Sequence, residues 1–515
     1  MLINYLRHIK NSTYYSIFSY ILLLATCLGL FIWWQASANF PDPDAFYHMK
    51  MAKLISEQGI ITDFPWMQYT VLKDYYIDHH LLYHISLIPF VSLIPTLYGI
   101  KISIIFFATS FIIGFSLILK ALKIKGSAIY GILMAMTVPL TFRLNLVKAN
   151  SLALLMLFLG IYLAYKKKYW WLFLLSFLYV WAYGGFILLL LVVGLYVVIN
   201  FICTRKLSWE LLLSVILGFA AGIIVNPYFP KNLSFYWQQV VQIGIINYQD
   251  KIGVGGEWYP YGLVELFTGC SLITVLLFIS ILLFCIFLKK QNSLSWFSLL
   301  LFIVGLVLVL KSRRYIEYYV PFSIFFIANS LHIVFTKYLW SDCKSIFHKF
   351  WQKNIFTKFI LFVISIYFLL IIPAIIVKDC LRNRDDLQSG IPYAKFAEAS
   401  AWLVNNTPQG SIVLHSDWDE FPNLFYYNSH NYFIVGLDPT FMYNYNQDLY
   451  WQWVNITIGK QKDDLPNILQ DNFHASYVFL EKDHTEMDNN MQQFSELELV
   501  YDDKEAKIYK VKGEE

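Results

Sequence analysis

The sequence predicts an α-helical membrane protein with many transmembrane helices and a small α/β domain at its C-terminal end. Hydrophobic residues make up 58% of the 515 residues and charged residues only 14%, whereas a soluble domain carries about 25% charged residues. Apolar runs of membrane-spanning length recur up to about residue 377, after which charged and amide residues become frequent. A soluble enzyme is therefore excluded, and a net charge of only +4 gives no argument for a nucleic-acid partner.

Eleven transmembrane spans are predicted from apolar length and from the placement of Lys and Arg. They cover residues 14–36, 100–119, 127–142, 150–165, 169–183, 185–203, 208–226, 264–288, 294–310, 315–336 and 355–377. With this count, the basic clusters at 120–125, 166–168, 205–206, 289–290 and 337–353 all lie on the cytoplasmic side. The apolar segment 81–98 would invert that pattern if it crossed the membrane. We therefore expect it to lie on the outer surface as an interfacial helix.

This topology divides the chain into a transmembrane domain, residues 1–378, and an extracytoplasmic domain, residues 379–515. The first domain carries outer loops at 37–99 and 227–263. In the second, strands are expected at 411–415, 432–437, 476–480, 497–501 and 506–511, and helices at 393–405, 447–458, 465–472 and 483–494. Strands that alternate with helices indicate an α/β domain.

The first outer loop contains carboxylates and histidines at the predicted membrane surface. Asp44 opens an amphipathic helix that ends before Gly59. It is either a helix N-cap or a carboxylate that ligates a metal or accepts a proton. Asp78, His79, His80 and His84 cluster at the start of the interfacial segment, where His80 and His84 are four residues apart and share a face. Asp44, Asp78, His79 and His80 are the predicted ligands of a divalent metal, Mg or Mn, and hydrogen bonding of the histidines at the headgroup boundary is the alternative.

Two short turns on the predicted outer side carry basic residues, against the orientation rule for short loops. Arg143 and Lys148 stand in one short turn, and Arg313 and Arg314 in another. A guanidinium binds phosphate oxygens in a bidentate manner, so we predict that these residues bind the phosphate of a lipid substrate. Contact with lipid headgroups, or pairing with Glu317, is the alternative.

Two further segments carry candidate residues. Glu257 follows three glycines of the outer loop 227–263, where a mobile loop would bring its carboxylate over a site; a solvated surface glutamate is the alternative. In the C-terminal domain, Trp418 and Asp419 follow a strand that ends at His415. A loop after a strand is a common place for recognition, and a simple polar turn is the alternative.

The order of these features resembles the catalytic subunit of oligosaccharyltransferases, within the C-type membrane glycosyltransferases. The resemblance rests on Asp44, Phe46-Tyr47-His48, Lys50 and Glu57-Gln58-Gly59 in the first loop, on Glu257, on Arg313 or Arg314, and on Asp417-Trp418-Asp419 in place of a Trp-Trp-Asp motif. It implies that Asp44 and Glu257 are catalytic and orient and activate the acceptor. It also implies that an outer arginine holds the lipid phosphate and that Trp418 and Asp419 recognise the acceptor.

Two departures from the family pattern bear on the metal and on the acceptor. Where the family has an acidic pair in its second outer loop, this chain has Lys148-Ala149-Asn150-Ser151. Lys148 is therefore an alternative source of the positive charge that a metal would supply. Trp-Asp-Glu-Phe-Pro replaces the usual Trp-Trp-Asp-Tyr-Gly, which leaves the acceptor open.

The predicted function is transfer of a sugar or oligosaccharide from a polyprenyl-(di)phosphate carrier to a protein or glycan acceptor. We expect a multi-pass protein of a bacterial or archaeal plasma membrane, in contact with the lipid bilayer and with its active site on the outer face. The alternatives are a C-type transferase acting on a lipid or glycan, a transporter of lipid-linked glycans, and an inactive scaffold. A transporter would place ionisable residues within the membrane, and the predicted spans hold almost none.

Overall fold

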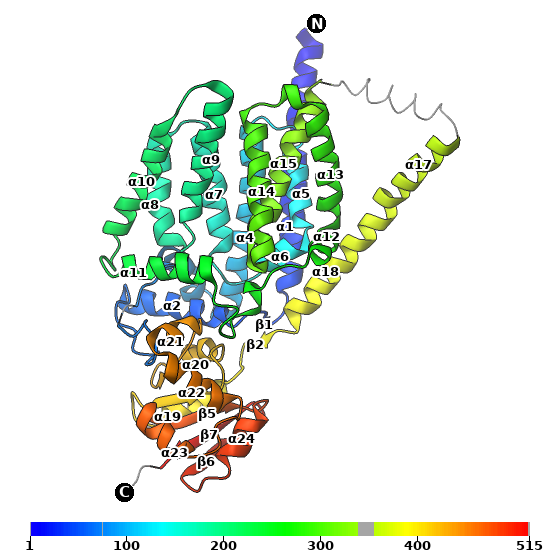
Figure 1. Cartoon of the computed structure of the whole chain (residues 1–515). Coiled ribbons are helices and arrows are strands. Elements are labelled where there is room, and N and C mark those ends of the chain that lie inside the picture. The colour runs from blue at the N-terminus through cyan, green and yellow to red at the C-terminus, as the bar shows by residue number, and fades with distance from the viewer. Residues whose placement is uncertain (1, 75, 338–354, 513–515) are drawn as a thin grey trace. The chain divides into compact units, whose positions relative to one another are not determined.

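The computed structural model describes residues 2–74, 76–337 and 355–512, and the chain divides into two compact units (Figure 1). Unit 1 comprises Met1–Ser37, Lys101–Gly222 and Glu257–Ser389, and unit 2 comprises Ala38–Ile100, Ile223–Gly256 and Gly390–Glu515. Three separate stretches of sequence thus build each unit. The boundary at residue 378 and the side of the membrane on which each segment lies stay predictions.

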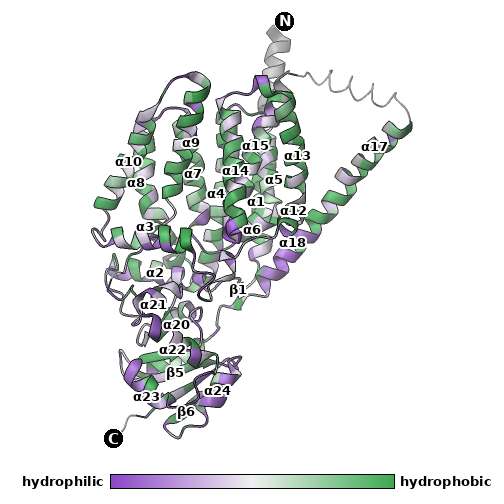
Figure 2. Ribbon diagram, in the orientation of Figure 1, coloured by the Kyte–Doolittle hydropathy of each residue, from purple (hydrophilic) through white to green (hydrophobic). Residues whose placement is uncertain are grey.

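Unit 1 consists of helices. They are α1 (Leu2–Gln35), α4 (Thr96–Ala121, which begins in unit 2), α5 (Ser127–Ala135), α6 (Val138–Leu144), α7 (Asn150–Tyr165), α8 (Tyr169–Ala182), α9 (Ile187–Thr204), α10 (Trp209–Ile224, which ends in unit 2), α12 (Leu263–Gly269), α13 (Ser271–Ile286), α14 (Ser293–Lys311), α15 (Ile316–Lys337), α17 (Ile355–Ile366) and α18 (Ile372–Gln388). Helix α14 packs against α15 and α9, and α7 packs against α8. Figure 2 shows that most of these helices are mainly hydrophobic, whereas α18 is hydrophilic toward its C-terminal end.

The number of spans agrees with the prediction only in part. Among the described residues, four helices are long and apolar enough to cross a membrane: residues 14–35 of α1, α4, α9 and α14. The number rises to six if two bent helix pairs are each counted as one span, while α7, α8 and α10 are apolar but shorter. The protein is thus a mostly helical membrane protein. Of the predicted cytoplasmic residues, Lys344, Lys349 and Lys353 lie outside the described part of the chain.

Two segments predicted as single spans are bent. Residues 127–142 form α5 and α6 at an angle of 78°, and residues 264–288 form α12 and α13 at 96°. Pro139 lies in the first turn of α6, and because proline has no N–H it cannot continue the hydrogen bonds of α5. The prediction that Arg143 lies in a turn is therefore wrong, since this residue belongs to the last turn of α6.

In unit 2, the first loop folds into α2 (Asp44–Gln58) and α3 (Leu81–Ser92). Gly59 ends α2 with a φ of 79°, as predicted for a C-terminal glycine. The prediction that Asp44 is the N-cap is wrong: Pro43 occupies that position, and Asp42 Oδ1 accepts the Asp44 backbone N–H at 2.8 Å. Helix α3 has 12 residues, fewer than the roughly 20 needed to cross a bilayer; its place on the outer surface stays a prediction.

Other segments of unit 2 surround these helices. The loop after α10 contains α11 (Asn232–Trp237) and a π-helical stretch, Gln238–Ile246. Strand β1 (Asn39–Phe40) pairs with β2 (Ile391–Pro392) in antiparallel fashion. This pairing joins the first loop to the start of the C-terminal region.

The C-terminal region is an α/β fold built on a five-stranded mixed sheet with the order β4-β3-β5-β7-β6. The strands are β3 (Ile412–His415), β4 (Tyr432–Phe433), β5 (Ala475–Glu481), β6 (Leu497–Asp502) and β7 (Ala506–Val511), and the helices are α19 (Ala397–Asn406), α20 (Phe421–Tyr427), α21 (Thr440–Tyr445), α22 (Gln447–Thr457), α23 (Leu465–Asn467) and α24 (Thr485–Met491). Strand β3 runs parallel to β4 and β5, and β7 is antiparallel to β5 and β6. All five predicted strands form, whereas α20 and α21 were not predicted.

Candidate functional site

In unit 1, three basic side chains surround the carboxylate of Glu257. Arg143 Nη1 donates to Glu257 Oε2, and Arg314 Nη1 donates to Glu257 Oε1 at 3.3 Å. Lys148 Nζ lies 3.8 Å from Glu257 Oε2. We call Arg143, Lys148 and Arg314 the cation cluster. Sequence analysis predicted each of these residues singly, and the structure brings them together around Glu257.

Local backbone contacts fix the segments that carry the cluster. Arg143 lies in the last turn of α6, after the 78° bend between α5 and α6. Asn150 at the start of α7 donates to the Arg143 carbonyl at 2.7 Å. Arg314 lies in the 3-10 turn Arg313–Tyr315 between α14 and α15. Ser312, just before this turn, donates through Oγ to the Glu257 carbonyl at 2.8 Å. These bonds hold the backbone of Glu257 beside α14, independently of its side chain.

A second carboxylate lies beneath the cluster. Glu317, in the first turn of α15, is 1% exposed, and its Oε2 lies 3.5 Å from Arg143 Nη2. Tyr183 also donates to Glu317 Oε1 at 3.4 Å. Sequence analysis offered Glu317 as a partner of Arg313 or Arg314, but its ion pair is with Arg143. A buried arginine needs such a partner, because removal of one member leaves an uncompensated charge.

The electrostatics of the cluster favour bound anions. Burial alone would raise the pKa of Glu257, but Lys148, Arg143 and Arg314 hold the pKa of this carboxyl well below its usual range. Within the described part of the chain, Arg143 Nε is buried and has no hydrogen-bond partner. The three cations therefore bind one carboxylate already, and one guanidinium donor is left for a further acceptor.

Arg313 and Arg314 are adjacent in sequence but have different surroundings. Arg313 Nη2 donates to Glu265 Oε2 at 3.1 Å, and both side chains of this pair are about half exposed, 46% and 50%. The guanidinium of Arg314 lies 4.9 Å from the centre of the Trp258 ring, beside Glu257. Of the two arginines, Arg314 belongs to the partly buried cation cluster and Arg313 to a more exposed ion pair.

In unit 2, three buried residues form a hydrogen-bonded chain. Asp78 Oδ2 accepts from His84 Nδ1 at 2.7 Å, and the other His84 nitrogen, Nε2, lies 2.7 Å from His48 Nδ1. His84 is 0%, Asp78 1% and His48 4% exposed. We call these residues the histidine chain. His48 lies one turn after Asp44 on α2, so the two share a face of that helix.

The predicted metal ligands were tested against these contacts. The described ranges contain no group of three or more His, Cys, Asp or Glu side chains arranged to hold a metal. Asp78 instead accepts from His84 and, at 3.0 Å, from the His80 backbone N–H. The His79 and His80 rings are tilted by 42° to one another, with centres 3.9 Å apart. As placed, Asp44, Asp78, His79 and His80 do not form a metal centre, and their role as ligands stays a prediction.

Trp418 and Asp419 lie in the turn after β3, as predicted. Trp418 is half-buried against the core of the α/β domain. Partial burial, together with Asp417, Glu420 and Glu481, raises the pKa of Asp419 to about 7. Since Asp419 itself is exposed at the surface, solvent limits this effect. The turn is thus acidic, and acceptor binding by Trp418 and Asp419 stays a prediction.

The bonds of the histidine chain were not predicted, because His48 and His84 are distant in sequence. The sequence placed His84 in a possible metal cluster with Asp78, His79 and His80, and His48 in the motif of the first loop, but it did not indicate that His48, His84 and Asp78 contact one another. A polar residue within an apolar helix is the one signal that pointed to His84, since such residues are usually paired.

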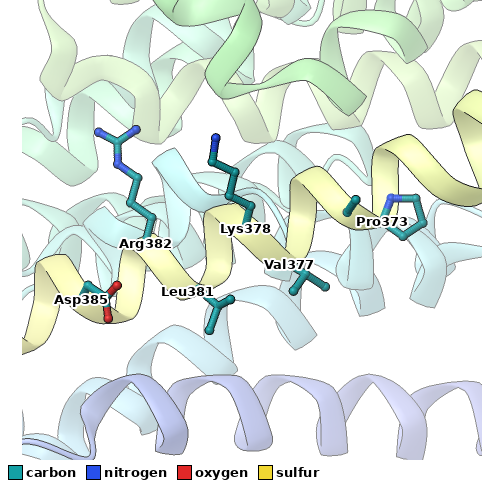
Figure 3. A pocket seen from close by; sticks show the side chains of 7 residues that line it. Pro373, Val377, Lys378, Leu381, Arg382 and Asp385 are labelled. Carbon is teal, nitrogen blue, oxygen red and sulfur yellow. The ribbon is translucent and has the colours of Figure 1, made fainter.

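A cavity of about 680 Å³ lies along α18 and is lined by Pro373, Ala374, Val377, Lys378, Leu381, Arg382 and Asp385. Figure 3 shows Lys378 and Arg382 on one side of the helix and Val377 and Leu381 on the other. No predicted site residue lines this cavity.

Comparison with known proteins identifies the fold. No family model and no curated protein sequence matches the chain. The structure is similar to the Archaeoglobus fulgidus oligosaccharyltransferase AglB in complex with an inhibitory peptide and a dolichol-phosphate, with a TM-score of 0.62 and 12% identity over 90% of this chain and 69% of that one. Another structure of this enzyme is a complex with Zn and sulfate.

Two further structures are similar over nearly the whole of this chain. ArnT from Cupriavidus metallidurans bound to undecaprenyl phosphate has a TM-score of 0.56 and 12% identity over 95% of this chain and 97% of that one. The arabinofuranosyltransferase AftD from Mycobacteria has a TM-score of 0.57 and 10% identity over 96% of this chain and 40% of that one. The resemblance seen in the sequence is thereby confirmed at the level of the fold: this chain has the fold of the C-type membrane glycosyltransferases.

Proposed function

We propose that the protein is a membrane glycosyltransferase that moves a sugar or oligosaccharide from a polyprenyl-(di)phosphate carrier to an acceptor. The observation that carries this proposal is the cation cluster of Arg143, Lys148 and Arg314, which binds a carboxylate and has an additional buried donor at Arg143 Nε. Clustered guanidinium and ammonium groups suit the oxygens of a phosphate. Similar structures contain dolichol-phosphate or undecaprenyl phosphate, which supports a lipid phosphate as the ligand here.

The proposed reaction breaks the bond between the anomeric carbon and the phosphate oxygen. An acceptor atom attacks that carbon and gives up its proton to a carboxylate, for which we propose Asp44. The phosphate leaves with the bonding electrons and gains negative charge. The cation cluster stabilises this charge because its donors are already in place before the reaction. We further propose that Glu257 orients the acceptor and that Trp418 and Asp419 bind it.

The divalent metal of the sequence prediction would add positive charge near the leaving phosphate. The predicted ligands do not form a centre as they are placed, whereas Lys148 stands 3.8 Å from the Glu257 carboxylate. We therefore assign neutralisation of the phosphate to the cation cluster, and no step requires the metal.

The acceptor is either a protein or another lipid or glycan. The likeness to an oligosaccharyltransferase supports a protein acceptor. The likeness to ArnT, which extends over 97% of this chain and 98% of that one, and to an arabinofuranosyltransferase keeps a lipid or glycan acceptor as the alternative. We also propose that the active site lies on the outer face of the membrane and that this membrane is a bacterial or archaeal plasma membrane.

Turnover of a radiolabelled lipid-linked sugar by the full-length protein in nanodiscs tests the proposal. Peptide and lipid acceptors are offered in separate arms. Arg314→Ala should raise KM for the donor about tenfold or more because charge-assisted bonds to phosphate are lost, and Arg314→Lys should give a smaller rise. Lys289→Ala, which removes an exposed charge, is the matched control.

Four outcomes distinguish the alternatives. Full activity in excess EDTA assigns the neutralising charge to the cluster, and loss of activity that Mg or Mn restores assigns it to a metal. Movement of labelled lipid across a vesicle membrane without sugar transfer identifies a transporter. Unchanged donor KM with raised acceptor KM in Arg314→Ala contradicts the phosphate role.

A further inference from the structure

Glu257 occupies the place where the proposed function needs a phosphate. Its two carboxylate oxygens accept from Arg143 and Arg314, and Lys148 lies 3.8 Å away. A carboxylate and a phosphate present similar oxygen acceptors to a guanidinium. The same donors cannot point fully at both anions, so the two compete for the cluster.

Of the two carboxylates beside the cation cluster, Glu257 has the side chain that can move more easily. Its side chain is 25% exposed, whereas that of Glu317 is 1% exposed and is also bonded by Tyr183. The Glu257 carbonyl accepts from Ser312 Oγ at 2.8 Å, so its backbone is anchored to the end of α14. Rotation of the side chain alone therefore suffices to vacate the cluster, without movement of the helices.

We propose that Glu257 is an internal competitor of the donor: its carboxylate fills the cation cluster in the donor-free protein, and the donor phosphate displaces it. The inference rests on the proposed function, because it takes the cluster as the phosphate site. Displacement frees the Glu257 carboxylate for the acceptor only after the donor is bound. The donor must therefore bind before the acceptor. Until it does, the carboxylate of Glu257 stays in the cation cluster and does not orient an acceptor.

The sign of one effect tests this inference. We expect Glu257→Gln in the full-length protein in nanodiscs to bind undecaprenyl phosphate about tenfold more tightly than wild type, since a ligand no longer has to displace a competitor. A residue that only held the arginines in place would give the opposite sign, with weaker binding of the lipid. Undecaprenol, which has the same chain and no phosphate, measures binding through the tail alone.

Controls separate the possible causes. Glu265→Gln removes the carboxylate that pairs with Arg313 and should leave lipid binding unchanged. If it tightens binding instead, Arg313 holds the phosphate and the inference fails. Should Glu257→Gln not fold, Glu257→Asp keeps the charge on a shorter side chain and should bind the lipid with intermediate affinity.

The inference and the proposed function fail in different ways. If Glu257→Gln binds undecaprenyl phosphate as tightly as wild type or more weakly, while Arg314→Ala binds it more weakly than wild type, Glu257 does not compete with the donor. Equal binding of undecaprenyl phosphate and undecaprenol by wild type, or no effect of Arg314→Ala, overturns the phosphate site itself.

Discussion

The cation cluster of unit 1 and the histidine chain of unit 2 are both groups of ionisable residues, but their surroundings differ. Glu257 and Arg314 are each 25% exposed at the side chain, and their contacts are ion pairs between full charges. Asp78, His84 and His48 are at most 4% exposed and are joined by directional hydrogen bonds. Charges that stay near solvent exchange partners readily, whereas a buried chain loses several bonds when one member is removed.

This difference leads us to propose different roles for the two groups. A cluster of exchangeable ion pairs suits the binding and release of an anionic ligand. A buried chain suits the positioning of a helix, here α2, which carries Asp44 one turn before His48. Single variants can test whether the cation cluster binds the lipid phosphate and whether α2 carries the residue that accepts the proton.

The largest expected effect is on turnover by Asp44→Asn. The loss should be about a hundredfold or more, as for removal of a general base. Thermal stability should stay the same, because Pro43 rather than Asp44 occupies the N-cap, and so should affinity for undecaprenyl phosphate. Turnover near the wild-type value would return Asp44 to a structural role.

The next largest expected effect is on the free energy of unfolding, to which the histidine chain should contribute. Asp78→Ala leaves the buried His84 Nδ1 and the His80 backbone N–H without their acceptor, and each lost bond should cost about 1–3 kcal/mol. Chemical denaturation of the purified protein would measure this change. Asp78→Asn, which keeps one acceptor oxygen, serves as the control and should cost less. Equal stability of all three proteins would show that the histidine chain does not position α2.

The smallest expected effect concerns Asp419. The pKa of this carboxyl is raised to about 7 in the folded protein, above its ordinary value of about 3.9. The folded state therefore binds the proton more tightly, so stability is highest at low pH and falls as pH rises between these two values. Solvent exposure reduces the loss to about 1 kcal/mol.

Thermal midpoints at pH 5 and pH 8 test this prediction in wild type and Asp419→Asn. The variant should be more stable than wild type at pH 8 and similar to it at pH 5, because its amide does not ionise. An equal pH dependence in both proteins would contradict the raised pKa.

The sequence predicted individual elements well where their signal is local. The helix over 150–165 has the predicted bounds, because an uninterrupted apolar run between polar turns is sufficient to define a helix in a membrane. The five strands of the C-terminal sheet were found for a similar reason. Helices α20 and α21 were missed because Phe421–Tyr427 and Thr440–Tyr445 are short and aromatic, without a helical period of apolar residues.

What the sequence determined by itself is therefore the class of protein, the residue types at the site and the anomaly of basic residues on the predicted outer side. Only the tertiary structure decided which of these residues meet. Arg143, after the 78° bend between α5 and α6, pairs with Glu257 in the 3-10 turn Gly256–Trp258 and with Glu317 in the first turn of α15, although both partners lie far along the chain. Sequence patterns report the periodicity of one segment at a time, whereas an ion pair between distant segments depends on how helices bend and pack.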